Sequence, residues 1–256
     1  MVLFFSPLEQ FNLLTVIPVV LFADALDLSL TNAFIIATTL IFFVAVYIFA
    51  LYREDNSVYI IPNKWQALLE MVQDLIYNLV STNINGKDSK AFAPVVFSVF
   101  LTVFFINVIG LVPYSFTLTS HICATLALSL ALFIGINIIC IKRHGIKFFT
   151  LFLPPGTPLA LALLLIPIEL ISYVFKPISL SIRLFANLMA GHTLLKVIAG
   201  FAYLLVDQTG VLFVSHYVPL LIISVLYVLE LAVALIQSFV FSILICIYIN
   251  DALNLH

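Results

Sequence analysis

The chain has 256 residues, of which 64% are hydrophobic and only 9% are charged, and its formal net charge is -2. About a quarter of the residues of a soluble domain are charged, so the composition excludes a soluble globular protein and indicates a polytopic membrane protein. The small negative charge excludes the basic surface expected of a nucleic-acid-binding protein. Three cysteines lie far apart in apolar runs and form neither a metal-binding signature nor an obvious disulfide set: Cys123, Cys140 and Cys246.

The N-terminal segment, residues 1–32, contains three acidic residues and no lysine or arginine. Three transmembrane helices are predicted after it, each about long enough to cross a hydrocarbon core of roughly 30 Å: 33–51, 91–112 and 120–141. Basic residues mark the loops on the synthesis side of a membrane, and the densest basic cluster, Lys142 to Lys147, follows the third helix. We therefore expect that loop on the synthesis side and the N-terminal segment on the opposite side.

Between the first two spans, residues 63–82 have the pattern of an amphipathic helix. Apolar side chains recur at helical intervals, whereas Glu70, Gln73 and Asp74 face the other way. Because such a helix keeps one face in water and the other out of it, we expect this helix to lie at the membrane interface.

The last hundred residues depart from this pattern, because two apolar runs, 158–206 and 212–253, carry ionisable side chains. The first run would be roughly 70 Å long as one helix, more than twice the thickness of the hydrocarbon core. Pro167 and Pro177 can kink such a helix without ending it. We therefore expect one long, strongly tilted or nearly horizontal helix, then a turn at 207–210 and a second tilted helix that completes a hairpin.

The polar residues of the first hairpin helix fall on defined faces. Four of them share one face because they are spaced by seven, seven and four residues: Glu169, Lys176, Arg183 and Asn187. His192, nine residues after Arg183, lies on roughly the opposite face. An unpaired guanidinium in hydrocarbon costs several kcal/mol, so the position of Arg183 calls for a functional reason.

Folding the two runs back on each other about Gly210 brings polar residues of both helices level. Three pairs come level or nearly so: Arg183 with Gln237, Glu169 with Asp251, and His192 with Glu230. The register can slip by several residues, but the order of the polar groups along the hairpin survives a small slip.

This order suggests two separate routes for protons. His192 and Glu230 can carry protons in from one side, and Glu169 and Asp251 can pass them to the other, each through a wet crevice that stops short of the centre. A fixed cation at Arg183 then blocks direct passage between the crevices and attracts a carboxylate. We expect a partner chain to supply that carboxylate.

Structural alternatives stay open for these residues. Arg183 could reach an interface or pair with an internal acid. His192 and Glu230 could be a hydrogen-bonded pair that holds two helices together. Four further residues could simply be solvated at the membrane interface: Glu169, Lys176, Lys196 and Asp251.

Four stretches resemble subunit a (subunit 6) of F-type ATP synthases: "SIRLFANLMAGH", "PPGTPLALALLLIPIELISY", "INVIGLVPYSF" and "LELAVALIQSFVFSIL". Three shorter ones resemble the mitochondrial, fungal form: "SPLEQF", "HGIKFF" and the closing "LNLH". The resemblance covers essentially the whole chain. It implies the stator half of a rotary proton motor, facing a ring of c subunits whose membrane-embedded carboxylate is protonated through one half-channel and deprotonated into the other.

The resemblance also implies roles for single residues. Arg183 matches the stator arginine of the family. The other matches are the intermembrane-space channel pair His192 and Glu230, the matrix-channel acids Glu169 and Asp251, and the polar neighbours of the arginine, Asn187 and Gln237. Bacterial members place an acid and a histidine where this chain has His192 and Glu230, so the swap keeps one imidazole and one carboxylate.

Location and partners follow from the same resemblance. It implies a multi-pass protein of the mitochondrial inner membrane, with the N-terminus towards the intermembrane space and the C-terminus towards the matrix. The expected partners are the c-ring, other stator and accessory subunits, lipid, water and protons, without nucleic acid, cofactor or metal. The sequence has no GxxxxGK[ST], so we expect a subunit of a catalytic complex that does not bind ATP itself, and whether the isolated chain is an enzyme stays open.

Three other classes of membrane protein fit the sequence less well. A secondary transporter predicts inverted repeats and glycine-broken helices, and the sequence shows neither; a stand-alone channel is a related alternative. An intramembrane hydrolase needs a nucleophile or metal motif, and HExxH and GxSxG are absent. A structural anchor gives no reason for so many ionisable residues in two apolar helices.

Overall fold

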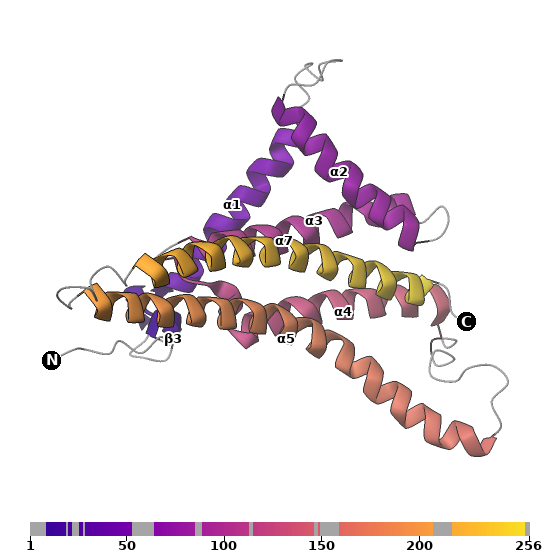
Figure 1. The fold of residues 1–256 in the computed structure, drawn as a ribbon. Helices are drawn as coiled ribbons and strands as arrows, with labels where there is room; N and C mark the ends of the chain where they lie inside the picture. The colour runs from indigo at the N-terminus through magenta and orange to yellow at the C-terminus, as the bar shows by residue number, and fades with distance from the viewer. Residues whose placement is uncertain are drawn as a thin grey trace. The chain divides into compact units, whose positions relative to one another are not determined.

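The computed structural model describes residues 9–18, 20–21, 26–27, 29–52, 64–84, 89–112, 115–145, 148, 159–206 and 217–253. Six α-helices make up most of this part of the chain (Figure 1): α1 (Asn32–Tyr52), α2 (Lys64–Asn83), α3 (Ser89–Leu111), α4 (Ile122–His144), α5 (Leu159–Val206) and α7 (Tyr217–Leu253). The predicted fold class, an all-α polytopic membrane protein, is confirmed.

Short strands precede α1, which the sequence analysis did not predict. β1 (Thr15–Ile17) pairs with β4 (Leu30–Thr31), and β2 (Val20–Leu21) pairs with β3 (Leu26–Asp27), both antiparallel. Strands of two or three residues are too short to give a readable alternation of apolar and polar residues. Asn32 joins this segment to the start of α1, because its side-chain oxygen accepts hydrogen bonds from the backbone N–H groups of Ala33 (2.9 Å) and Leu14 (3.3 Å).

Four helices of the described part are long and apolar enough to cross a membrane: α3, α4, the Leu164–Leu205 part of α5, and α7. α1 adds a shorter apolar stretch, Asn32–Val46. Side chains of the chain itself bury only 6% of the apolar window in α5, so most of that helix surface is available to lipid or to partner subunits. The chain is a multi-pass membrane protein.

The helix α5 has 48 residues and passes through Pro167 and Pro177 without a break. At 1.5 Å per residue its length is about 72 Å, and the 37 residues of α7 span about 56 Å. Both exceed the roughly 30 Å of a hydrocarbon core. The predicted turn at 207–210 and the predicted helix start at 212–216 lie outside the described residues.

The helix α2 has the amphipathic pattern expected for residues 63–82, with a wider apolar surface than expected. Ile76, Leu79 and Val80 are buried against the chain, while Glu70, Gln73 and Asp74 are exposed. Three further apolar side chains remain exposed at helical spacing: Leu68, Met71 and Leu75. These three form a second apolar strip that the described residues leave exposed.

Contacts divide the chain into two units. Unit 1 comprises Met1–Leu51, Thr102–Ile122 and Leu184–Gln237, and unit 2 comprises Tyr52–Leu101, Cys123–Arg183 and Ser238–His256. Helices α3, α5 and α7 contribute residues to both units. In unit 2 the buried face of α7 contains small side chains four residues apart, Ser238, Ser242 and Cys246, which allow close approach of neighbouring helices.

Candidate functional site

The first group of polar residues lies in unit 1, on α5 and α7. Glu230 and Gln237, seven residues apart on α7, are 6% and 7% exposed. The side-chain amide of Asn187 on α5 donates a hydrogen bond of 2.9 Å to the Gln237 oxygen. The sequence prediction had Arg183 level with Gln237, so the residue that contacts Gln237 lies one helical turn further along α5.

A small cavity of unit 1 joins this pair to Glu230. It is lined by Asn107 of α3 together with Asn187, Glu230 and Gln237, and apolar side chains close the remainder. Asn107 is almost fully buried in the middle of an apolar helix, a position from which the sequence allowed equally a role in helix packing or at the intermembrane-space entrance. A third helix therefore contributes to the site.

Several buried polar atoms in unit 1 have no hydrogen-bond partner among the described residues. They include both carboxylate oxygens of Glu230, the Asn107 side-chain oxygen, the Gln237 side-chain nitrogen and Nε2 of His192. Leaving a buried polar atom unpaired costs about 1–3 kcal/mol, and ordered water commonly removes that cost. These atoms are therefore suited to bind water and, through it, protons.

Glu230 of α7 lies against α5 at Gly191, the residue directly before His192, and the pairing of His192 with Glu230 itself stays a prediction. Glu230 packs against Gly191, because a Cβ atom at Gly191 would lie 2.1 Å from the Glu230 Oε1 atom. The His192 ring meets the backbone of Gly110 at the end of α3, and its Nε2 atom is unpaired within the described residues. The unpaired atoms of both side chains argue against the alternative of a hydrogen-bonded pair that only joins helices.

The end of α3 receives side chains from several parts of unit 1. The Ser115 hydroxyl donates to the backbone oxygen of Ile109 (2.7 Å), and the Tyr227 hydroxyl of α7 donates to that of Leu111 (3.4 Å). The last carbonyls of a helix lack hydrogen-bond partners within the helix, and these hydroxyl groups supply partners for two of them at the end of α3. They also fix the backbone against which His192 lies.

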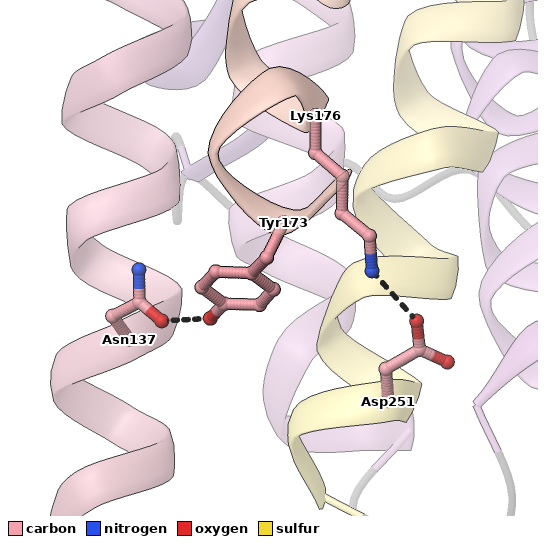
Figure 2. Close-up of polar contacts among 4 residues, drawn as sticks. All are labelled: Asn137, Tyr173, Lys176 and Asp251. Carbon is pink, nitrogen blue, oxygen red and sulfur yellow. Dashed lines mark hydrogen bonds and ion pairs between the residues drawn. The ribbon is translucent and has the colours of Figure 1, made fainter. Parts of the chain in front are cut away.

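The second group of polar residues lies in unit 2. Figure 2 shows Lys176 reaching from α5 to Asp251 on α7, with 3.5 Å between Nζ and Oδ2. The hairpin was expected to bring Glu169 level with Asp251, whereas the residue that contacts Asp251 lies seven residues further along α5. Lys176 therefore has an acidic partner within the chain, and the expectation that it also reaches to the membrane interface stays a prediction. Glu169 is half-buried on α5, two helical turns before Lys176.

Aromatic rings surround the ion pair. The Lys176 ammonium lies 5.4 Å from the centre of the Tyr173 ring and 5.1 Å from that of Tyr248. The Tyr173 hydroxyl donates a hydrogen bond to the Asn137 side chain of α4 (Figure 2). These three residues were not predicted from the sequence, because single tyrosines and asparagines in apolar helices are also common in helix packing and at lipid interfaces.

Arg183 is half-buried and forms no ion pair or hydrogen bond with any residue that the structure describes. It interacts electrostatically with Tyr248 of the same unit. Because α5 is continuous, Arg183 shares a face with Lys176, seven residues before it, and with Asn187, four residues after it. The alternative of an internal acidic partner for Arg183 finds no support in this part of the chain.

The described residues contain no group of three or more histidine, cysteine, aspartate or glutamate side chains that could hold a metal ion. Instead, side chains that can bind protons and water lie both before and after Arg183 in the sequence of α5.

Comparisons with known proteins identify a family. Residues 33–250 match the family described as "ATP synthase A chain". The sequence is 45% identical over 255 residues to ATP synthase subunit a of Marchantia polymorpha, covering 98% of this chain and 99% of the relative. It is 46% identical to that of Chondrus crispus (98% and 97% covered) and 47% identical to that of Pylaiella littoralis (99% and 100% covered). The narrower resemblance to the fungal form stays a prediction.

Proposed function

The chain belongs to the ATP synthase subunit a family, and we propose that it is the stator subunit that, together with a ring of c subunits, couples proton movement across a membrane to rotation and ATP synthesis. In this role the chain provides two offset aqueous half-channels and binds no nucleotide. Its partners are the c-ring and other membrane subunits of the same complex.

The main observation behind this proposal is that Arg183 has no carboxylate partner among the described residues. A guanidinium within an apolar helix stays charged, and the described residues offer it no carboxylate. A carboxylate on the c-ring, presented to the same face of α5, supplies the missing partner. Between partners the fixed positive charge repels protons and separates the two half-channels.

Each of the two groups of polar residues lines one of the two half-channels in this proposal. We assign His192 and Glu230, with Asn107 at the same cavity, to proton uptake from the intermembrane space. Glu169 and Asp251 release protons towards the matrix. Asn187 and Gln237, which hydrogen-bond each other one turn from Arg183, order the polar surface next to the arginine.

The lengths of α5 and α7 support a tilted hairpin. A helix of about 72 Å placed upright would project some 40 Å beyond a core of roughly 30 Å, and its apolar surface would then face water. A strongly tilted helix keeps this surface in lipid or against the ring. We assign the protein to the mitochondrial inner membrane, with its N-terminus in the intermembrane space and its C-terminus in the matrix.

Replacing Arg183 by alanine in the assembled complex tests the proposal. We expect Arg183→Ala to abolish proton-driven ATP synthesis and to allow passive proton leak, because nothing then separates the half-channels. Synthesis and leak are measured separately in reconstituted vesicles. Lys196→Ala is the matched control, since it removes a cation from the same helix away from the proposed barrier. Normal coupling in the Arg183→Ala complex would refute the proposed function.

A further inference from the structure

Lys176 is held on three sides in unit 2. Its ammonium contacts Asp251 at 3.5 Å and lies over the rings of Tyr173 and Tyr248 at 5.4 and 5.1 Å. Figure 2 shows the side chain extended from α5 to the carboxylate on α7. A solvated lysine has no such constraint, because its four-carbon stem rotates freely and its ammonium is strongly hydrated. We call these four residues the lysine clamp.

The clamp is itself anchored to α4. Tyr173 hydrogen-bonds Asn137, and its ring packs on that of Phe133 at 4.8 Å between centres. Nearby, the His144 ring nitrogen hydrogen-bonds the backbone oxygen of Leu253 at 3.1 Å and so ties the end of α7 to the end of α4. Both partners of the Lys176–Asp251 pair are thus attached to the same neighbouring helix, which fixes where the carboxylate lies.

We propose that Lys176 is a positioning residue for proton release: fixed between two tyrosine rings, its ammonium holds the Asp251 carboxylate against α5. This inference rests on the proposed role of Asp251 in the matrix-side path. The Asp251 side chain is 43% exposed, so without its partner it is free to turn into solvent and away from the seam between α5 and α7. A proton released at that seam would then lose its nearest acceptor.

Other titratable and charged groups also face Asp251. Tyr173 and Tyr248 interact with it electrostatically, and Arg183 interacts with Tyr248. His144 lies at the end of α7, two residues from Asp251, through its bond to Leu253. Among these groups, Lys176 is the one that pairs directly with the carboxylate, so its removal is the change that frees Asp251 with the least disturbance elsewhere.

The test compares Lys176→Gln with Lys176→Arg in the reconstituted complex. We expect Lys176→Gln to slow proton-driven ATP synthesis about tenfold, because a displaced acceptor lengthens the proton path, and to cause no leak. We expect Lys176→Arg to restore the rate, because arginine keeps the charge and also stacks on aromatic rings. The dependence of the rate on matrix-side pH should change in Lys176→Gln and not in Lys176→Arg, whereas a loss of packing alone would lower the rate equally at every pH.

A second pair of variants tests the rings. Tyr248→Phe keeps the aromatic face and should leave synthesis near the wild-type rate, whereas Tyr248→Leu removes the face and should behave like Lys176→Gln. If the Lys176→Gln complex does not assemble, the two Tyr248 variants still test whether the lysine clamp positions Asp251. Equal rates for the phenylalanine and leucine variants would overturn the inference.

Asp251→Asn separates this inference from the proposed function. If Asp251→Asn leaves synthesis unchanged, the proposed matrix-side role is wrong. If Asp251→Asn slows synthesis but Lys176→Gln does not, only the lysine clamp is refuted. In the double variant we expect no loss beyond that of Asp251→Asn, because both changes act on one carboxylate, and multiplied losses would contradict the inference.

Discussion

At the scale of single residues, the site depends on side chains that are polar, buried and unpaired. Membrane helices normally satisfy their polar groups within the bundle, since hydrocarbon offers no substitute. In unit 1, the carboxylate of Glu230 and Nε2 of His192 depart from that rule among the described residues. A stable protein retains such groups where they carry a function, and proton transfer through water is the function that these two groups fit.

Gly191 shows how narrow the space around Glu230 is. An added Cβ would lie 2.1 Å from Oε1, 2.8 Å from Cδ and 3.2 Å from Cγ of Glu230. We therefore predict that Gly191→Ala displaces the carboxylate and slows proton-driven synthesis by on the order of 10- to 100-fold. Leak should not increase, because Arg183 is untouched. The measurement is the synthesis rate in vesicles, with leak recorded in the same preparation.

Gly200 provides the matched control for this prediction. It lies in the same helix, and apart from its chain neighbours and the adjacent helix backbone no heavy atom of the described residues lies within 4 Å of an added Cβ. Gly200→Ala should therefore keep the wild-type rate, and alanine is also the better helix former. Equal effects of the two substitutions would show that the contact with Glu230 does not limit proton uptake.

At the scale of elements, the contacts between α5 and α7 are all displaced in the same direction from the level expected for a simple hairpin. In a hairpin folded about Gly210, residues at equal sequence distance from Gly210 would lie level. The sequence distances of the observed partners differ by one residue for Gly191 and Glu230, by four for Asn187 and Gln237, and by seven for Lys176 and Asp251. Side chains lean towards the N-terminus of their own helix, so in an antiparallel pair longer side chains meet further from level. All three mismatches have the direction that this lean gives, because in each pair the α5 residue lies nearer to Gly210 in sequence than its α7 partner.

The buried face of α7 limits how close the helices lie, and Ser242 tests it. Ser242 is fully buried, and its hydroxyl donates to the Ser238 backbone oxygen at 3.0 Å. We predict that Ser242→Leu overpacks this face and destabilises the protein by about 1–3 kcal/mol. The yield of assembled complex and its thermal unfolding temperature should both fall.

Ser224 on the same helix is the control, because its hydroxyl makes the same kind of bond, to Leu221 at 2.7 Å, on an exposed surface. Ser224→Leu should leave assembly and stability unchanged. A stable Ser242→Leu complex would mean that the small side chains of this face do not set the helix spacing.

At the scale of the whole molecule, hydropathy predicted the fold class because four apolar helices of the described part are long enough to cross a bilayer. The site was harder to predict. Arg183 and Glu230 stand out in apolar sequence, but nothing in the sequence distinguishes Glu169 from Lys176 as the residue level with Asp251, since both lie on one face two turns apart. Asn107 comes from a third helix, and sequence spacing within one hairpin carries no information about that contact.

The orientation of the chain in the membrane is the last prediction. The final turn of α4 carries Lys142, Arg143 and His144, so from the positive-inside rule we expect this end in the matrix and the start of α4 in the intermembrane space. Cys123, near that start, is exposed, whereas Cys140 and Cys246 are buried. A membrane-impermeant maleimide should therefore label the native protein at Cys123 from the intermembrane-space side alone.

The opposite end provides the complementary measurement. Lys142 is exposed, so Lys142→Cys in a Cys123→Ser background should be labelled from the matrix side alone, in inverted inner-membrane vesicles and not in right-side-out ones. The Cys123→Ser protein itself should remain unlabelled from both sides. Labelling with the reverse sidedness would invert the chain in the membrane, and with it the assignment of His192 and Glu230 to uptake and of Glu169 and Asp251 to release.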